Sequence, residues 1–135
     1  MAFRLSKNSE VKLAGVNPAL ANVVRRAIEI TTVDFAVVQG NRTQAEQNAL
    51  YEQGRTKPGP KVTWTRNSNH IGGRAVDLAP FYKGKIEWDN NGKLGLYSKI
   101  NDAMQQAAKE LGVKIKWGGE WSKTPDRPHF ELVKD

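Results

Sequence analysis

Cysteine is absent from this chain of 135 residues. Its absence excludes disulfide bonds, thiolate metal ligands and a thiol protease, so any bound metal must be held by nitrogen and oxygen atoms. Long hydrophobic runs are also absent, since no segment approaches the roughly 20 apolar residues that span a membrane. The first residues, Met1 to Lys7, lack the apolar core of a signal peptide, and we therefore expect synthesis in the cytoplasm.

Acidic residues are few relative to basic ones: 14 Asp and Glu stand against 21 Lys and Arg, which gives a formal net charge of +7. Such a balance favours polyanionic partners, whether nucleic acid, anionic membrane or cell-wall polymer. The basic residues are scattered, however, and the sequence has neither zinc-finger spacing nor an RNA-binding aromatic motif. We therefore expect no specific nucleic-acid partner and no insertion into a membrane.

The length fits a single domain over residues 1–135. Helical spacing of apolar residues and capping residues predict three helices, and short alternating or β-branched runs predict five strands. This order predicts an α+β fold, in which helices flank a small, mostly antiparallel sheet. The predicted helices follow Asn17-Pro18, run from Thr43 toward Gly54, and cover Leu96 to Leu111; the predicted strands are 33–39, 74–79, 85–88, 113–117 and 128–133.

Histidine is nearly absent too, and each of the two histidines lies near a carboxylate. His70 shares a short segment with Asp77, and His129 follows closely after Asp126. Two imidazoles and one carboxylate would leave a zinc ion with an open fourth position, which is the composition of a catalytic site. In the last strand, His129 and Glu131 would face one way. The spacing leaves a second interpretation open, in which both histidines are ordinary loop or strand residues and Asp77 is a cap.

Two further residues suit hydrolysis of an amide bond. Asp126 could accept a proton from a metal-bound water and pass it to the leaving amine. Arg42, between the strand that ends near Gln39 and the helix that starts at Thr43, could stabilise the oxyanion of the tetrahedral intermediate. The alternative interpretation of Arg42 is a surface arginine.

The motif Ser68-x-His70-x-x-Gly73-x-Ala75-x-Asp77, followed by Asp126-x-x-His129, resembles the signature of the zinc D-alanyl-D-alanine peptidase superfamily. That superfamily includes VanY- and VanX-like enzymes and shares a Hedgehog-like fold. Two more segments resemble it: Gly40-Asn41-Arg42-Thr43 with Gln47, and Trp117-Gly118-Gly119-Glu120-Trp121. Size and the Pro128-His129-Phe130-Glu131 ending most resemble the single-domain phage L-alanyl-D-glutamate endopeptidases, which are endolysins.

The resemblance implies a role for each matching residue. His70, Asp77 and His129 are expected to ligate zinc, and Asp126 is expected to be the catalytic base. Arg42 would bind the substrate or stabilise the transition state, with Ser68 and Gln47 in support. Many members carry glutamate where this chain has Asp126, so Glu120 is kept as a reserve candidate for the base.

The function expected from this resemblance is zinc-dependent hydrolysis of the L-alanyl-D-glutamate bond in peptidoglycan stem peptides. One alternative is a D-alanyl-D-alanine carboxypeptidase, and another is a noncatalytic module that binds cell wall or nucleic acid. We expect a monomer with no separate cell-wall-binding domain. It would accumulate in the host bacterial cytoplasm and reach the wall after release by a separate pore-forming protein.

Overall fold

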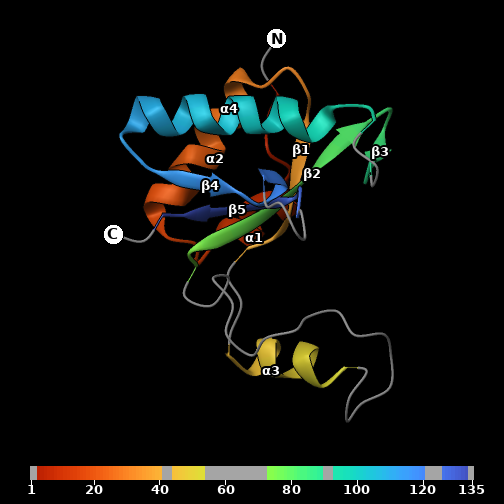
Figure 1. Ribbon diagram of the computed structural model, residues 1–135, viewed down its shortest axis with the longest axis vertical. Helices are drawn as coiled ribbons and strands as arrows, with labels where there is room; N and C mark the ends of the chain where they lie inside the picture. Colours follow the sequence, from red (N-terminus) through yellow and green to blue (C-terminus); the bar gives the residue numbers. More distant parts are fainter. Residues whose placement is uncertain (1–2, 41–43, 54–72, 90–92, 121–125, 134–135) are drawn as a thin grey trace.

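A computed structural model describes residues 3–40, 44–53, 73–89, 93–120 and 126–133 (Figure 1). Within α3 the side chains at 44, 45, 47 and 50 are outside the description. The elements are α1 (Lys7–Leu13), α2 (Pro18–Ile30), β1 (Phe35–Gln39), α3 (Gln44–Glu52), β2 (Ala75–Tyr82), β3 (Lys85–Ile86), α4 (Leu96–Leu111), β4 (Ile115–Trp117), the 3-10 turn η1 (Gly118–Glu120) and β5 (His129–Leu132).

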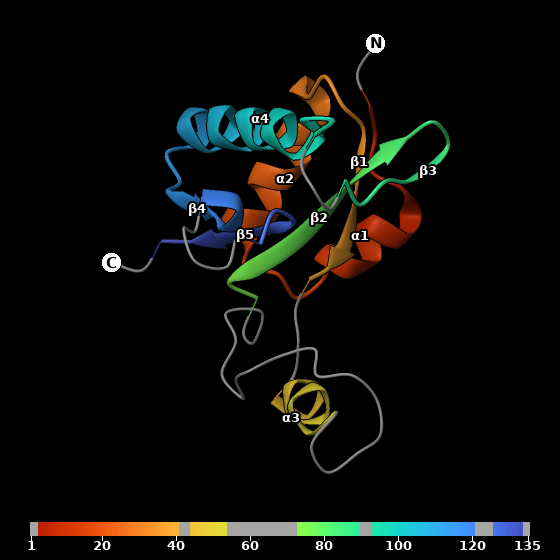
Figure 2. The same ribbon diagram turned by 45° about the vertical axis from the view of Figure 1, so that its right-hand side comes forward.

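The sheet has the strand order β1-β2-β5-β4, and β3 pairs with β2 off this path. Every pairing is antiparallel. The long strand β2, from the middle of the chain, is therefore central, and its neighbour β5 comes from near the C-terminus, as Figure 2 shows. Helices beside an antiparallel sheet confirm the predicted α+β class.

The hydrophobic core lies between one face of this sheet and helices α2 and α4, which pack against each other (Figure 1). Phe130 of β5 is fully buried there, together with Val76 and Leu78 of β2. Alternate side chains of a strand point to opposite faces, so the residues between these lie on the face away from α2 and α4. That second face carries Asp77 and His129.

The ends of the two long helices follow their sequence signals. The Asn17 side chain accepts a hydrogen bond from the Ala19 amide at 2.9 Å, and Pro18 occupies the first turn of α2. Helix α4 ends at Gly112, whose backbone is left-handed. Both predicted helices are confirmed. None of the helices in the described ranges has the length and apolar character that a membrane span requires.

Several element boundaries differ from the sequence predictions. Helix α1 was not predicted, because one short helix of seven residues shows too little periodicity; the Ser6 side chain caps it by accepting from the Ser9 amide at 3.1 Å. The strand predicted over 74–79 is longer, since β2 continues to Tyr82, whereas the strand predicted over 85–88 is shortened to β3, Lys85–Ile86. Hydrogen bonding to β1 and β3 explains the extension of β2.

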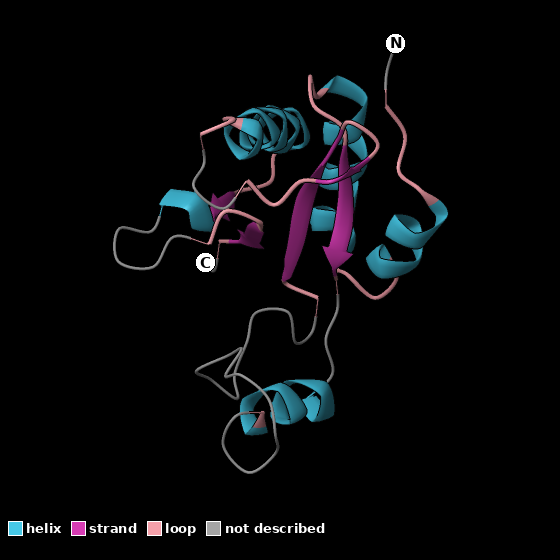
Figure 3. Cartoon of the chain, turned by 90° about the vertical axis from the view of Figure 1, so that its right-hand side faces the viewer, coloured by secondary structure: helices cyan, strands magenta, loops and turns pink. Residues whose placement is uncertain are grey.

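The predicted helix after Thr43 is present as α3, which lies apart from the sheet and the other helices in all three views (Figure 3). Its predicted capping residue Thr43, its predicted end at Gly54 and the predicted loop over 55–69 lie outside the described residues.

Candidate metal centre

The centre begins with the register between β2 and β5. Asp77 lies directly opposite His129, and Ala75 lies opposite Glu131. Residues opposite each other in an antiparallel pair project to the same face. All four side chains are therefore on the face away from the helix-covered core, and the small side chain of Ala75 leaves space beside Glu131.

The hydrogen bonding of the two strands brings the side chains of Asp77 and His129 close. The amide of Leu78 donates to the carbonyl of Pro128 at 2.8 Å, so the next pair along, Asp77 and His129, is of the non-hydrogen-bonded type. Side chains are closer in such pairs than in hydrogen-bonded ones. Two residues far apart in the sequence thus meet across adjacent strands.

Both nitrogens of the His129 ring have a carboxylate neighbour. Nδ1 lies 3.3 Å from Oδ1 of Asp77, and Nε2 lies 2.8 Å from Oε1 of Glu131. The His129 side chain is 9% exposed, that of Asp77 is 23% exposed and that of Glu131 is 15% exposed. The imidazole is thus enclosed, while Asp77 keeps a path to solvent.

Asp126 joins this group through the turn that enters β5. The amide of His129 donates to the carbonyl of Asp126 at 3.1 Å, and the amide of Asp126 donates to the carbonyl of Gly118 at 2.9 Å. As a result Asp77, Asp126 and His129 each offer a ligand-type atom within 4.8 Å of the others. Asp126 is exposed, in contrast to the buried His129.

The turn that holds Asp126 rests on β4 and η1. The Trp117 indole Nε1 donates to the carbonyl of Arg127 at 2.7 Å, and its ring stacks on Phe130 with centroids 6.4 Å apart. A Cβ on Gly118 would lie 2.4 Å from the carbonyl oxygen of Asp126 and 3.0 Å from the His129 Cβ. Glycine at 118 therefore allows the backbone to approach the site.

The donor set fits a divalent metal. Two carboxylates and one imidazole supply oxygen and nitrogen atoms. Zinc binds both kinds of atom, so the site needs no thiolate ligand. The atoms converge on the partly open face of the sheet and not in the apolar core. The described residues can therefore bind a metal ion.

Charge around His129 favours its protonation. Burial lowers the pKa of His129, but the hydrogen bonds and charges of Asp77 and Glu131, with the charge of Asp126, outweigh burial and raise the pKa above its usual value. Burial raises the pKa of Tyr97 to about 12, and the negative charges of Asp89, Asp126 and Asp77 add to the rise. The Tyr97 hydroxyl is thus neutral at physiological pH.

The structure brings together three of the residues predicted from the sequence, Asp77, Asp126 and His129. The other predicted ligand, His70, lies outside the described residues, as do Arg42 and Ser68. Gln47 lies in α3, but its side chain is outside the description.

Two further carboxylate residues belong to elements next to the centre, Glu120 in η1 and Glu131 in β5. Glu120, the reserve candidate for the base, ends η1 and is exposed, and within the described ranges the metal-type cluster does not include it. Strand alternation predicts Glu131 on the same face as His129 but predicts no role for it. Strand alternation was the signal that could have led to its contact with the imidazole.

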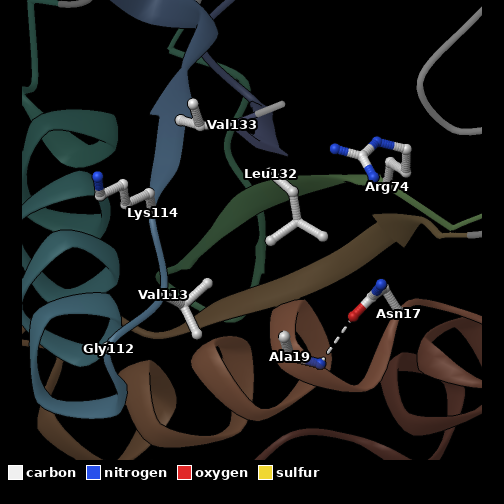
Figure 4. A pocket seen from close by; sticks show the side chains of 8 residues that line it. All are labelled: Asn17, Ala19, Arg74, Gly112, Val113, Lys114, Leu132 and Val133. Carbon is white, nitrogen blue, oxygen red and sulfur yellow. Dashed lines mark hydrogen bonds between the residues drawn. The ribbon is translucent and has the colours of Figure 1, made fainter. Parts of the chain in front are cut away.

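A separate hollow of about 760 Å³ lies on the helix-covered side of the sheet (Figure 4). Leu132 lines it, and alternation along β5 directs Leu132 away from the face of His129; Arg74, which immediately precedes β2 and whose carbonyl accepts a hydrogen bond from the Leu132 amide at 2.9 Å, lines it as well. No carboxylate or imidazole is among its described lining residues, so it does not belong to the metal centre. The lining consists of Asn17, Ala19, Arg74, Gly112, Val113, Lys114, Leu132 and Val133.

Comparison with known proteins adds an independent line of support. A family model described as phage L-alanyl-D-glutamate peptidase matches residues 1–133. The chain is 41% identical over 136 aligned positions to the L-alanyl-D-glutamate peptidase of Escherichia phage T5, covering 99% of this chain and 92% of that protein. It is 36% identical to the peptidoglycan L-alanyl-D-glutamate endopeptidase CwlK of Bacillus subtilis, over 84% of this chain and 69% of that protein.

Solved structures agree with these relatives. The Serratia marcescens L-Ala D-Glu endopeptidase ChiX superposes with a TM-score of 0.81 at 34% identity, covering 98% of this chain and 91% of that one. The vancomycin resistance D,D-dipeptidase VanXYg shares the fold, with a TM-score of 0.56 at 22% identity over 87% of this chain and 50% of that one. The predicted resemblance and the predicted peptidase class are confirmed. The chain belongs to the phage L-alanyl-D-glutamate peptidase family.

Proposed function

We propose that this chain is a zinc-dependent endopeptidase that hydrolyses the L-alanyl-D-glutamate bond of peptidoglycan stem peptides. The observation that carries the proposal is the convergence of Asp77, Asp126 and His129 on one face of the sheet. Family membership supports the bond assignment, because the relatives from Escherichia phage T5 and Bacillus subtilis are named for this cleavage. The same names argue against a D-alanyl-D-alanine carboxypeptidase and against a noncatalytic binding module.

In this proposal His70, Asp77 and His129 hold the zinc ion. Register fixes Asp77 and His129 opposite each other on neighbouring strands, so both are positioned by rigid elements. His70 is assigned from its place in the sequence motif alone. When bound, zinc supplies a Lewis acid for the scissile carbonyl and a water of lowered pKa.

Asp126 is proposed as the general base. It is exposed at the edge of the centre, where an incoming peptide can reach it, and its backbone is fixed by hydrogen bonds to Gly118 and His129. An ionised carboxylate only accepts hydrogen bonds, so it can take a proton from the attacking water and then donate it to the leaving amine. Arg42 is proposed to stabilise the oxyanion, and Ser68 and Gln47 to support the site and the substrate.

The proposal also covers where the protein acts and how it reaches the cell wall. The chain acts as a monomeric, single peptidase domain over residues 1–135, and the net charge of +7 attracts it to the anionic wall. It accumulates in the host cytoplasm, does not insert into the membrane, and reaches peptidoglycan after a separate pore-forming protein has opened that membrane.

Replacement of Asp126 tests the assignment of the base. Asp126→Ala should lower hydrolysis of peptidoglycan by about 10² to 10⁴-fold, the usual contribution of general acid-base catalysis. Its zinc content, measured by atomic absorption, should remain that of the wild type. The matched control is Glu120→Gln, which changes an exposed carboxylate in the preceding turn and should leave the rate unchanged.

Two outcomes would contradict this assignment. Loss of zinc from Asp126→Ala would make Asp126 a metal ligand, which its place within 4.8 Å of Asp77 and His129 also permits. Unchanged hydrolysis in Asp126→Ala, with loss in Glu120→Gln, would instead make Glu120 the base.

A further inference from the structure

The imidazole of His129 lies between two carboxylates that have different surroundings. Asp77, on the Nδ1 side, belongs to the group of metal-type ligands that also includes Asp126. Glu131, on the Nε2 side, is not a member of that group in the described part of the chain. The two ring nitrogens therefore face different carboxylates, Nδ1 one that belongs to the group of ligand-type atoms and Nε2 one that does not belong to it among the described residues.

The shorter contact decides the role of each nitrogen. Nε2 lies 2.8 Å from Oε1 of Glu131, a good hydrogen-bond distance, whereas Nδ1 lies 3.3 Å from Oδ1 of Asp77. An ionised carboxylate cannot donate, so the Glu131 contact requires the proton to be on Nε2. A neutral imidazole with its proton on Nε2 keeps its lone pair on Nδ1, which is the nitrogen beside Asp77.

The backbone explains why Glu131 can reach the ring. His129 and Glu131 alternate along β5 and share one face, and the residue opposite Glu131 on β2 is the fully buried Ala75. A methyl group there leaves room for the Glu131 side chain to lie beside the imidazole. At 15% exposure, the Glu131 carboxylate is shielded from competing water.

We propose that Glu131 is a positioning residue of the metal centre: its carboxylate accepts a hydrogen bond from the Nε2-H of His129 and thereby makes Nδ1 the metal ligand. This inference rests on the proposed zinc site and adds to it a specific ligand atom and a residue that holds it. A carboxylate behind a ligating histidine fixes the tautomer and the ring orientation and increases the basicity of the ligand.

The test compares Glu131→Ala and Glu131→Gln with the wild type in two measurements that do not depend on hydrolysis. Zinc affinity is measured by competition with a chromophoric chelator, and the His129 tautomer is read from ¹⁵N chemical shifts with and without zinc. Glu131→Ala should weaken zinc binding by about 10 to 100-fold, the usual effect of losing such a partner. In the wild type, Nε2 should carry the proton in both samples, and zinc should shift the resonance of Nδ1.

Glu131→Gln keeps an acceptor oxygen without the charge, so it should preserve the Nε2-H tautomer and lose less affinity than the alanine variant. The control is Glu29→Gln, which removes an exposed carboxylate of α2 and should change neither measurement. Circular dichroism verifies that each variant is folded. If Glu131→Ala alone fails to fold, the glutamine variant and the wild-type tautomer decide the question.

Zinc coordination through Nε2, or unchanged affinity in both Glu131 variants, would overturn the proposal. Suppose that the Glu131 variants lose zinc affinity and the His129 tautomer is as expected, but the wild-type protein cuts no peptidoglycan. That outcome would refute the proposed reaction and leave the positioning role standing. Conversely, full hydrolysis with Nε2 coordination would refute the positioning role alone.

Discussion

At the scale of single residues, the metal centre depends on a close backbone approach at Gly118. A Cβ there would collide with the carbonyl oxygen of Asp126 and crowd the Cβ of His129. The turn would have to move, and with it both the proposed base and a proposed ligand. Gly118 thus couples η1 to the chemistry although it has no functional side chain.

Gly118→Ala should therefore lower both stability and zinc affinity. Overpacking of this kind costs about 1 to 3 kcal/mol in the free energy of unfolding. The measurements are urea denaturation and chelator competition. The control is Gly95→Ala, where an added Cβ meets no atom within 4 Å but the backbone φ is 67°, so stability should fall without loss of zinc affinity. Wild-type zinc affinity in Gly118→Ala would contradict this account.

Individual residues of the centre were predictable to different degrees. Asp77, Asp126 and His129 could be identified because the chain has only two histidines and the motif places carboxylates near them. The contact between Glu131 and Nε2 of His129 could not be predicted, because alternation assigns a residue to a face but does not determine how side chains on that face meet.

At the scale of elements, the start of β1 carries an electrostatic cost. The Asp34 side chain accepts a hydrogen bond from the Phe35 amide at 2.9 Å, and the Asp34 carbonyl accepts one from Phe81 of β2 at 2.9 Å. Burial raises the pKa of Asp34, and the hydrogen bond from Phe35 offsets this only in part. The Asp34 carboxyl group therefore holds its proton more tightly in the folded protein than in the unfolded chain.

The sign of the pH effect follows from that raised pKa. Asp34 favours folding below the ordinary carboxyl pKa of about 3.9, and this contribution is lost as the pH rises through the raised value in the folded state. Asp34→Asn keeps an acceptor for Phe35 and removes the buried charge. It should raise the melting temperature at pH 7, and the gain should disappear near pH 3.

Thermal melts across that pH range test the prediction. Asp102→Asn, which changes an exposed residue of α4, is the control and should show no comparable gain at pH 7. A lower melting temperature for Asp34→Asn at pH 7, or a gain that persists unchanged at pH 3, would contradict the assigned cost of burial.

Elements with strong local signals were predicted well, and those set by distant contacts were not. Helix α2 has an asparagine cap, a first-turn proline and a continuous apolar stripe, and α4 has a stripe closed by glycine. Helix α1 is short, and its burial depends on packing against β1, which no local pattern indicates. The length of β2 was likewise underestimated, because β1 and β3 supply its hydrogen bonds.

At the scale of the whole molecule, the centre joins β2 to β5 and so links the middle of the chain to its C-terminal end. A zinc ion held by Asp77 and His129 would bind the folded protein and not the unfolded chain. Ligand binding of that kind stabilises the fold by about 2.7 kcal/mol when free ligand is 100 times the dissociation constant. The metal is therefore expected to contribute to stability as well as to catalysis.

Removal of zinc with a chelator should accordingly lower the melting temperature, and added zinc should restore it in a concentration-dependent way. His129→Ala, which lacks one proposed ligand, serves as the control and should show little response to either treatment. Scanning calorimetry supplies the measurement. Equal responses of the wild type and His129→Ala would place the stabilising metal elsewhere.

The central claim is that the chain uses a metal to cut one bond of the wall peptide, and mass analysis of digested peptidoglycan tests metal and bond together. Purified wall incubated with the zinc-loaded protein should yield new alanine carboxyl termini and new glutamate amino termini, and a parallel digest with chelator should yield neither. Release of terminal D-alanine, the absence of new termini, or equal digestion in the presence of chelator would contradict the account.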